Sequence, residues 1–369
     1  MNSYVCDQDY RIASNVPGAD VFGSGAVDPD VKPFRQSEYT FEFQREVSRA
    51  TVFTGRFLYR NLDQAVEDAG IFSASGEAYV IGNPGAGLHL KLLNDLGYKK
   101  VAVPERKYKA LQLEVDSRYV KNFNFNANYT FSRLRGNYSG LAGPDELTAA
   151  GGSRNDPNVL RDFDLPHVGF TATGQEAKGL LPLDRTHVLK ASGTYSHQWM
   201  GRTSNMTDIS FFTTAQSGTP KTSFISIFFI PIPETTRGDL GRTPTFTQTD
   251  LSFTHRYRFG NDGRFAVAFD FNVLNVLNQN TILAVNQNKH SGYFGYTQGT
   301  TGNYVTDINT LTSSGVLAQY QAAEAAFCIN PAAPTANTCG TGVTRNVAFN
   351  QPISWQDPRT VRFGFRFQF

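Results

Sequence analysis

The sequence lacks the long apolar run that a membrane-spanning helix requires. Such a helix needs about 18 or more consecutive apolar residues, and the most apolar stretch here, SFISIFFIPIP at residues 223–233, is interrupted by Ser and Pro. The first residues, MNSYVCDQDYRIASNV, have neither a basic start nor an apolar core, so they do not resemble a secretory signal peptide. Membrane helices are therefore not expected, whereas membrane strands, which carry only half an apolar face each, are not excluded.

Charge, cysteine and tryptophan are also scarce. Charged residues make up 18% of the chain, below the roughly 25% of soluble domains, and a net charge of +2 argues against a nucleic-acid partner. Two of the three cysteines, Cys328 and Cys339, flank the loop-like segment CINPAAPTANTC. They can close a small disulfide if this loop lies outside the cytoplasm, and free thiols are the alternative. The 2 Trp stand against 30 Phe, 16 Tyr and 33 Gly, a profile typical of β-rich proteins.

Alternating sequence is abundant. In FNFNANYTFS, residues 123–132, Phe, Ala and Tyr occupy the odd positions and Asn, Thr and Ser the even ones, so a strand there has one apolar and one polar face. The same period of two recurs along the chain, and each segment is near the ~9–11 residues with which a tilted strand crosses a bilayer. The nine strands predicted in this way are residues 38–47, 51–61, 108–117, 123–132, 186–198, 206–216, 246–259, 264–275 and 359–369.

The connections between the predicted strands are alternately short and long. Compact domains rarely contain structureless loops beyond about 15 residues, whereas outer-membrane barrels have tight periplasmic turns and long external loops. We therefore predict an all-β fold, an antiparallel transmembrane β-barrel segment of about nine meandering strands. Residues 1–37 are expected to form an upstream irregular segment, and residues 38–369 the barrel portion. A secreted β-sandwich or propeller with long insertions is the alternative that this pattern disfavours.

The last strand fixes the register of the two faces. With Val361 and the four following odd-numbered Phe facing lipid, Arg362 and Arg366 face the lumen; a slip by one residue would place both Arg in hydrocarbon, at roughly 2–4 kcal/mol each near the midplane. The same alternation predicts a set of charged side chains that face the lumen. The strongest candidates are Glu42, Glu114, Asp116, Asp270, Arg362 and Arg366.

Several segments resemble a known family. The chain ends in RTVRFGFRFQF, which resembles the carboxy-terminal signal by which outer-membrane barrels are recognised by their assembly machinery, through Phe363, Phe365, Phe367 and Phe369. The segments LPLDRTHVLKASGTY (181–195), TRGDLGRTPTFTQTDLSF (236–253) and FDFNVLNVLNQN (269–280) resemble late barrel segments of TonB-dependent outer-membrane receptors. The closest similarity is to the Oar-like branch, whose members carry a carboxypeptidase-regulatory-like domain before the plug, and it covers the chain from about residue 38 to its end.

The resemblance implies a function and a set of partners. Such receptors lie in the cell outer membrane, have a 22-strand barrel filled by a plug domain, and take up a solute with energy from the TonB complex. Neither a plug nor a TonB box is recognisable in this sequence, and nine strands is an odd number where single-chain bacterial barrels have an even one. We therefore expect this chain to be part of a receptor. A passive porin-like channel and a secreted structural or adhesive β-protein are the alternatives, and the solute, or an export or adhesion role, stays open.

No catalytic or metal site is predicted. The segment DRTH groups Asp184, Arg185 and His187, but it lies where a long loop enters a strand, and a structural role is the favoured interpretation. The six histidines show no ligand spacing, so the chain is expected to be no enzyme and to hold no cofactor. Asp156, Asp162 and Asp164 favour a solvated loop over a Ca²⁺ site. Residues 315–327 have helix propensity inside the longest loop.

Overall fold

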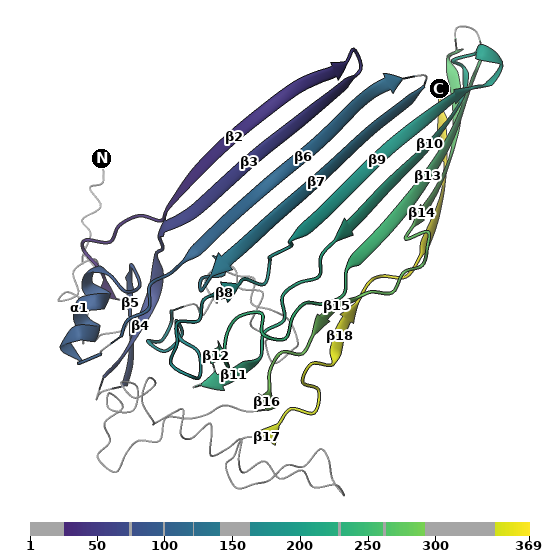
Figure 1. Cartoon of the computed structure of the whole chain (residues 1–369). Helices are drawn as coiled ribbons and strands as arrows, with labels where there is room; N and C mark the ends of the chain where they lie inside the picture. Colours follow the sequence, from purple (N-terminus) through teal and green to yellow (C-terminus); the bar gives the residue numbers. More distant parts are fainter. Residues whose placement is uncertain are drawn as a thin grey trace, which may run out of the picture.

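The molecule has two parts, a long sheet and a folded region at one end of it. The computed structural model describes residues 26–73, 76–98, 100–120, 122–140, 163–227, 230–260, 263–291 and 344–369. Nine long strands form an open, curved sheet, which we call the wall (Figure 1). The segments before the first wall strand and within the long connections gather at one end of the sheet, and we call their described residues the cap.

The wall is an antiparallel meander in which consecutive wall strands pair with one another. All nine predicted strands are confirmed, and a short strand, β8 (Gly179–Leu180), adds to β7. Within the described residues β2 and β19 each pair on one side only, so the sheet is not closed into a barrel. The strands are β2 (Arg35–Ser48), β3 (Thr51–Gln64), β6 (Arg106–Val120), β7 (Phe123–Gly136), β9 (His187–Gln198), β10 (Asn205–Gln216), β13 (Phe246–Phe259), β14 (Phe265–Leu274) and β19 (Thr360–Gln368).

The predicted alternation of short and long connections is also confirmed. The turns β2–β3, β6–β7, β9–β10 and β13–β14 lie at the end of the wall away from the cap, together with the carboxy terminus (Figure 1). The turns after β6, β9 and β13 use residues with positive φ, such as Asn122 at 67° and Gly260 at 84°, because these reversals need a left-handed backbone that Asn and Gly adopt readily. The helices within the described residues are all too short or too polar to cross a bilayer.

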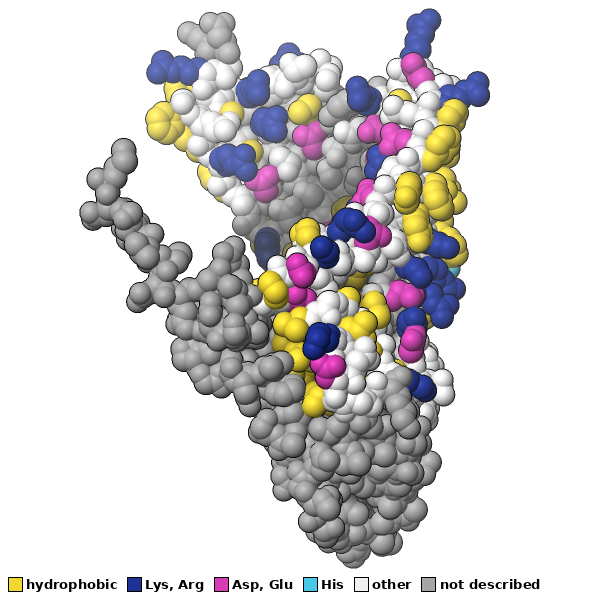
Figure 2. All heavy atoms as spheres, turned by 90° about the vertical axis from the view of Figure 1, so that its left-hand side faces the viewer, with side chains coloured by type: hydrophobic (Ala, Val, Ile, Leu, Met, Phe, Trp, Pro, Cys, Tyr) yellow, Lys and Arg dark blue, Asp and Glu magenta, His cyan; other side chains and the backbone are white. Residues whose placement is uncertain are grey.

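One face of the wall is apolar and the other polar across all nine strands. The strand register pairs apolar residues with apolar ones: Phe253 lies opposite Phe271, which lies opposite Phe363. One residue along, Ser252 lies opposite Asn272, which lies opposite Arg362. We call these the aromatic face and the polar face. In the view of Figure 2, hydrophobic side chains gather on the outer side of the wall at the right, and charged side chains line the hollow beside it.

The cap contains most of the buried apolar core among the described residues. Its elements are β1 (Ala26–Val27), β4 (Glu67–Ser73), β5 (Gly76–Gly82), α1 (Gly87–Asp95), β11 (Phe224–Ile227), β12 (Ile230–Pro233), β15 (Ile282–Val285), β16 (His290–Ser291), β17 (Thr344–Arg345) and β18 (Pro352–Trp355). The core packs α1 and the β4–β5 hairpin against the β11–β12 pair; its fully buried members include Ile71, Leu92, Leu93, Ile227 and Ile232. Segments expected only as loops are therefore folded, and the apolar stretch 223–233 supplies β11 and β12 of this core.

Close backbone contacts join the cap segments. Asp28 accepts a hydrogen bond from the backbone N–H of Leu88 at 2.9 Å and so caps the start of α1. Gly70 donates its N–H to the carbonyl of Phe163 at 3.1 Å, and a Cβ at this position would lie 1.4 Å from the Asp164 carbonyl oxygen. Only glycine allows the two backbones to lie this close, so Gly70 holds the first long connection against the second.

Three predictions lie outside the described residues. These are the Cys328–Cys339 pairing, the helix over residues 315–327, and the positions of Asp156 and Asp162 in the acidic loop.

Candidate functional site

The six charged residues predicted to face the lumen all lie on the polar face, in two groups at opposite edges of the wall. Glu42 on β2 accepts from Arg56 at 2.5 Å, and Glu114 on β6 accepts from Asn126 at 3.0 Å. At the other edge, Asp270 on β14 pairs with Arg366 on β19 at 3.5 Å. Asp116 follows Glu114 on the same face of β6, and Arg362 lies opposite Asn272. That this face lines a lumen stays a prediction.

Short side chains connect neighbouring strands across the polar face. Ser196 donates to Asp208 at 2.6 Å, and Thr254 donates to Asp270 at 2.8 Å. Ser252 donates to the amide oxygen of Asn272 at 2.6 Å. These cross-strand bonds stabilise the sheet and satisfy the carboxylates. The polar face is thus suited to water, and its acidic side chains are held by arginine, amide and hydroxyl groups of neighbouring strands.

A pocket of about 370 Å³ lies where the polar face meets the cap, and we call it the wall pocket. Arg60 is paired with Glu38 at 2.5 Å, and Arg106 donates to the Ser139 carbonyl oxygen. Guanidinium groups, a phenol and amides beside leucine side chains suit a small polar or anionic solute with an apolar part. The pocket is lined by Gln36, Leu58, Arg60, Arg106, Tyr108, Gln112, Leu134 and Leu183.

Sequence reasoning did not find the wall pocket. Alternation places Arg60 on the polar face, but the pocket also requires the register that sets Arg60 opposite Tyr108. It further requires Leu183, which the second long connection brings over the sheet. The only signal in the sequence was the polar-face parity of Arg60, which does not reveal a neighbour on another strand.

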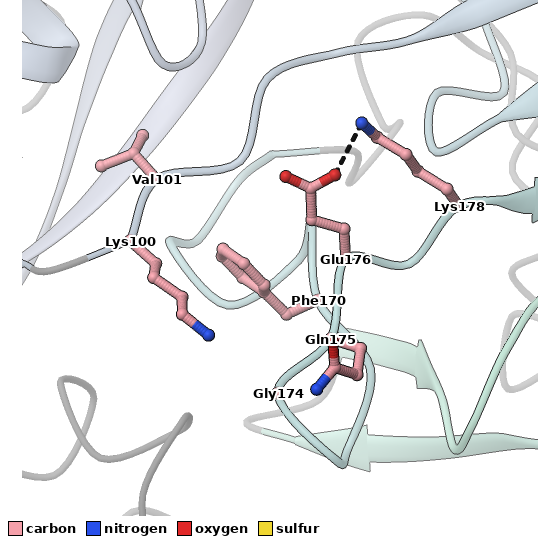
Figure 3. Close-up of a pocket in the computed structure, with 7 residues that line it drawn as sticks. All are labelled: Lys100, Val101, Phe170, Gly174, Gln175, Glu176 and Lys178. Atoms are coloured by element: carbon pink, nitrogen blue, oxygen red, sulfur yellow. Dashed lines mark ion pairs between the residues drawn. The ribbon is translucent and has the colours of Figure 1, made fainter.

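A second pocket, of about 520 Å³, lies within the cap, and we call it the cap pocket (Figure 3). Its lining comes from two separate segments, residues 100–101 and 170–178. Lys178 contacts Glu176 at 2.6 Å and Glu105 at 3.2 Å, and the hydrogen bond to Glu176 raises the pKa of the Lys178 ammonium. With Lys178 paired to two carboxylates, the exposed side chains of Lys100 and Gln175 are the polar groups of the lining that are best placed to meet a bound molecule.

Comparison with known proteins gives the relationship of the chain. No family model matches the sequence. The chain is 29% identical over 358 residues, 94% of its length, to the TonB-dependent transporter Oar of Myxococcus xanthus. The chain is thus similar to an Oar transporter along nearly its whole length. It spans 29% of the length of Oar.

One solved structure is also similar. The outer-membrane transporter YddB from Escherichia coli matches 73% of this chain and 32% of its own, with a TM-score of 0.40 and 13% identity. The Oar-like resemblance inferred from the sequence is confirmed by the curated relative. The wall is an open antiparallel sheet with one apolar and one polar face, the arrangement expected of a segment of a transmembrane β-barrel.

Two of the segments that carry the Oar-like resemblance meet at the junction of wall and cap. Asp184, from DRTH, is buried and accepts from the backbone N–H of Leu134 at 2.5 Å and from the Arg242 guanidinium. Arg242, from GRTP, also donates to the Gly218 carbonyl at 2.9 Å. His187 instead contacts the Tyr129 hydroxyl at 2.7 Å. We call the Asp184–Arg242 pair the junction clamp; it fixes the starts of β9 and β13.

The clamp joins an acidic and a basic side chain and has no metal-type cluster near it among the described residues. The described part of the chain contains no group of three His, Cys, Asp or Glu side chains placed to hold a metal ion. The named relative is a transporter.

Proposed function

We propose that this chain is the carboxy-terminal barrel part of an outer-membrane transporter that takes up a solute with energy from a TonB complex. The observation that carries the proposal is the aromatic face, which continues across nine strands in one register. A face of this kind suits lipid, and the polar face behind it suits a wet interior. The relationship to Oar supports transport and TonB coupling.

The open edges support a larger barrel. Each edge strand leaves a row of backbone N–H and C=O groups without a partner strand in the described structure, and an unsatisfied backbone group in hydrocarbon costs several kcal/mol. The edges therefore require further strands, which we assign to another part of the same receptor, up to the 22 strands of the family. A plug domain would then cover the polar face, where Glu42, Glu114, Asp116, Asp270, Arg362 and Arg366 meet it or the solute.

The aromatic carboxy terminus has a separate role in this proposal. Phe363 and Phe365 are about three-quarters exposed, at 72% and 75%, and Phe369 is 90% exposed. Together with Phe367 they lie along the aromatic face of the edge strand β19, which runs to the turn end of the wall and is accessible there to the barrel assembly machinery. We propose that this edge is the assembly signal and that the same side chains face lipid after insertion.

The first experiment tests transport against a passive channel. The full-length protein that carries this chain is purified from outer membranes and placed in planar bilayers. A plugged transporter gives no steady ion conductance in the absence of an energy source, whereas steady conductance would contradict the proposal and favour a porin-like channel. Recovery of the protein in the soluble fraction would instead favour a secreted β-protein.

The second experiment tests the wall pocket. Solutes that accumulate in the periplasm are compared by mass spectrometry between cells with and without a functional TonB complex. The double variant Arg60→Gln/Arg106→Gln is expected to reduce accumulation of the TonB-dependent solute. The matched control Arg45→Gln/Arg49→Gln removes the same charge at the turn end and should leave accumulation unchanged. Equal uptake by both variants would exclude the wall pocket from the route.

A further inference from the structure

Four basic side chains form a cluster at the cap end of the aromatic face. Lys107 and Lys109 lie on β6, directly opposite Arg135 and Arg133 on β7. All four side chains are exposed. Their neighbours on the opposite face of β7, Ser132 and Leu134, are buried. We call these four residues the basic quartet.

The quartet departs from the normal rules of a β-sheet. Like charges directly opposite one another on neighbouring strands are destabilising, and here two such pairs occupy successive rows. Lys107 contacts Glu105 at 3.3 Å, and Lys109 lies over the ring of Tyr59 at 5.6 Å. Within the described structure Lys109, Arg133 and Arg135 have no acidic partner among the ion pairs. An external anion would remove the repulsion.

The position of the quartet indicates where that anion is. The aromatic face of β7 is apolar from Phe123 to Phe131, and Arg133 and Arg135 lie two and four residues further, about 7 and 13 Å along the strand. The row of Arg133 and Lys109 continues into Tyr59 and Tyr39, whose rings stack at 6.2 Å. Tyrosines of this kind mark the level of the membrane–water interface. The quartet therefore lies at headgroup depth, just beyond the apolar band.

We propose that the basic quartet binds the phosphate groups of an anionic lipid in the outer leaflet. The inference rests on the proposed function only for orientation, since long connections of outer-membrane barrels face outward. The fork geometry of Arg133 and Arg135 suits bidentate contact with phosphate oxygens, and the flanking lysines add charge. The acyl chains of such a lipid would lie along Leu111 and Phe131, which are exposed on the same face.

The test uses the full-length protein in nanodiscs of phosphatidylcholine with increasing fractions of a diphosphorylated glycolipid. Thermal unfolding reports binding, because a ligand that binds the folded state raises Tm. We expect the glycolipid to raise Tm of the wild type. In the double variant Arg133→Gln/Arg135→Gln, the glycolipid fraction that gives half of the Tm rise should increase about thirtyfold. Each basic residue near an anionic surface contributes about 1 kcal/mol, and about 1.4 kcal/mol corresponds to a tenfold change in affinity.

Three comparisons make the result decisive. Arg133→Lys/Arg135→Lys should retain most of the affinity because it keeps the charge, and Arg45→Gln/Arg49→Gln should match the wild type. Equal Tm rises in the Arg133→Gln/Arg135→Gln variant and the wild type would overturn the proposal. So would a full rise with inorganic phosphate alone, because the site would then need no lipid. A full rise with phosphatidylglycerol at the same phosphate density would support the proposal and identify an anionic phospholipid as a sufficient ligand. Transport does not enter this readout, so failure here leaves the proposed function standing.

Discussion

The wall and the cap use hydrophobic residues in opposite ways. In the wall, Phe41 is 72% exposed and Phe365 is 75% exposed, whereas in the cap Ile71, Ile227 and Ile232 are fully buried at 0%. In the proposed function the aromatic face of the wall contacts lipid, so the wall needs no apolar core of its own. The cap must build its own core, as any water-soluble domain does. The same change in side-chain size or charge should therefore have different consequences in the two regions.

The largest expected effect comes from the junction clamp that joins the two regions. Asp184→Asn should cost about 3 to 4 kcal/mol, because it leaves the Arg242 guanidinium beside a buried neutral amide. The measurement is chemical unfolding of the full-length protein in detergent. The control is Asp95→Asn, which breaks the exposed Lys91–Asp95 pair at 2.6 Å and should cost less than about 1 kcal/mol. Equal losses would mean that the clamp is no stronger than a surface pair.

The next effect separates cavity formation from contact with lipid. Ile232→Ala in the cap should cost about 3 kcal/mol, because it removes methyl groups and leaves a cavity in a packed core. Ile209→Ala on the aromatic face of β10 should cost less, since lipid chains fill the space. Hydrogen exchange of cap and wall peptides measures both effects locally. A larger loss at Ile209 would contradict the division between wall and cap.

A charge placed on each face of one strand tests the orientation of the wall. Phe253→Arg on β13 should destabilise the inserted protein by about 2 to 3 kcal/mol, because the aromatic face meets hydrocarbon. Ser252→Arg, one residue earlier on the polar face, should cost clearly less. Folding into lipid vesicles, followed by unfolding in denaturant, gives both values. The reverse order would show that the polar face is the one in contact with lipid.

The smallest effect is a pH dependence confined to the cap. Burial lowers the pKa of His167 to about 3 and lowers the pKa of His89 as well. In the unfolded chain the pKa of a histidine is near about 6.5, so below that pH the unfolded chain binds protons that the folded cap does not bind. The stability of the cap is therefore full above about pH 6.5 and falls as the pH drops toward about 3. At about pH 5 the loss from His167 should be about 2 kcal/mol.

Hydrogen exchange of cap peptides from about pH 7 to about pH 5, corrected for the intrinsic exchange rate, measures this loss. His167→Gln should remove most of the pH dependence without changing that of the wall. Cap protection that is constant over this interval would show that the histidine is not a source of acid sensitivity.

The wall could be predicted from the sequence because its rule is local. A period of two identifies a strand and its two faces from about ten residues, and the alternation of connections gives the meander. The six polar-face residues followed from the same parity. The cap could not be predicted, because its core joins distant segments: Gly70 against Asp164, or Asp28 at the start of α1. The core role of the stretch 223–233 could not be predicted, because its packing partners, Leu92 and Leu165 among them, lie in other connections.

The candidate site was predictable to the same extent. Parity placed Glu42 and Arg366 on one face, but strand register decides which side chains are neighbours across the sheet. The wall pocket and the basic quartet both depend on register, the first through Arg60 opposite Tyr108 and the second through Lys109 opposite Arg133.

The long-range contacts of the cap also have a consequence for the order of folding. The Arg237 guanidinium donates to the Asn137 carbonyl at 3.4 Å across 100 residues of chain. Contacts of such separation carry a large loop-closure entropy and form late, whereas the hairpins of the wall form early. We therefore expect an intermediate in which the strands are inserted while the external mouth is still unstructured. During that interval the isoleucine-rich hairpin β11–β12 is exposed, and the nascent chain is most vulnerable to aggregation and proteolysis.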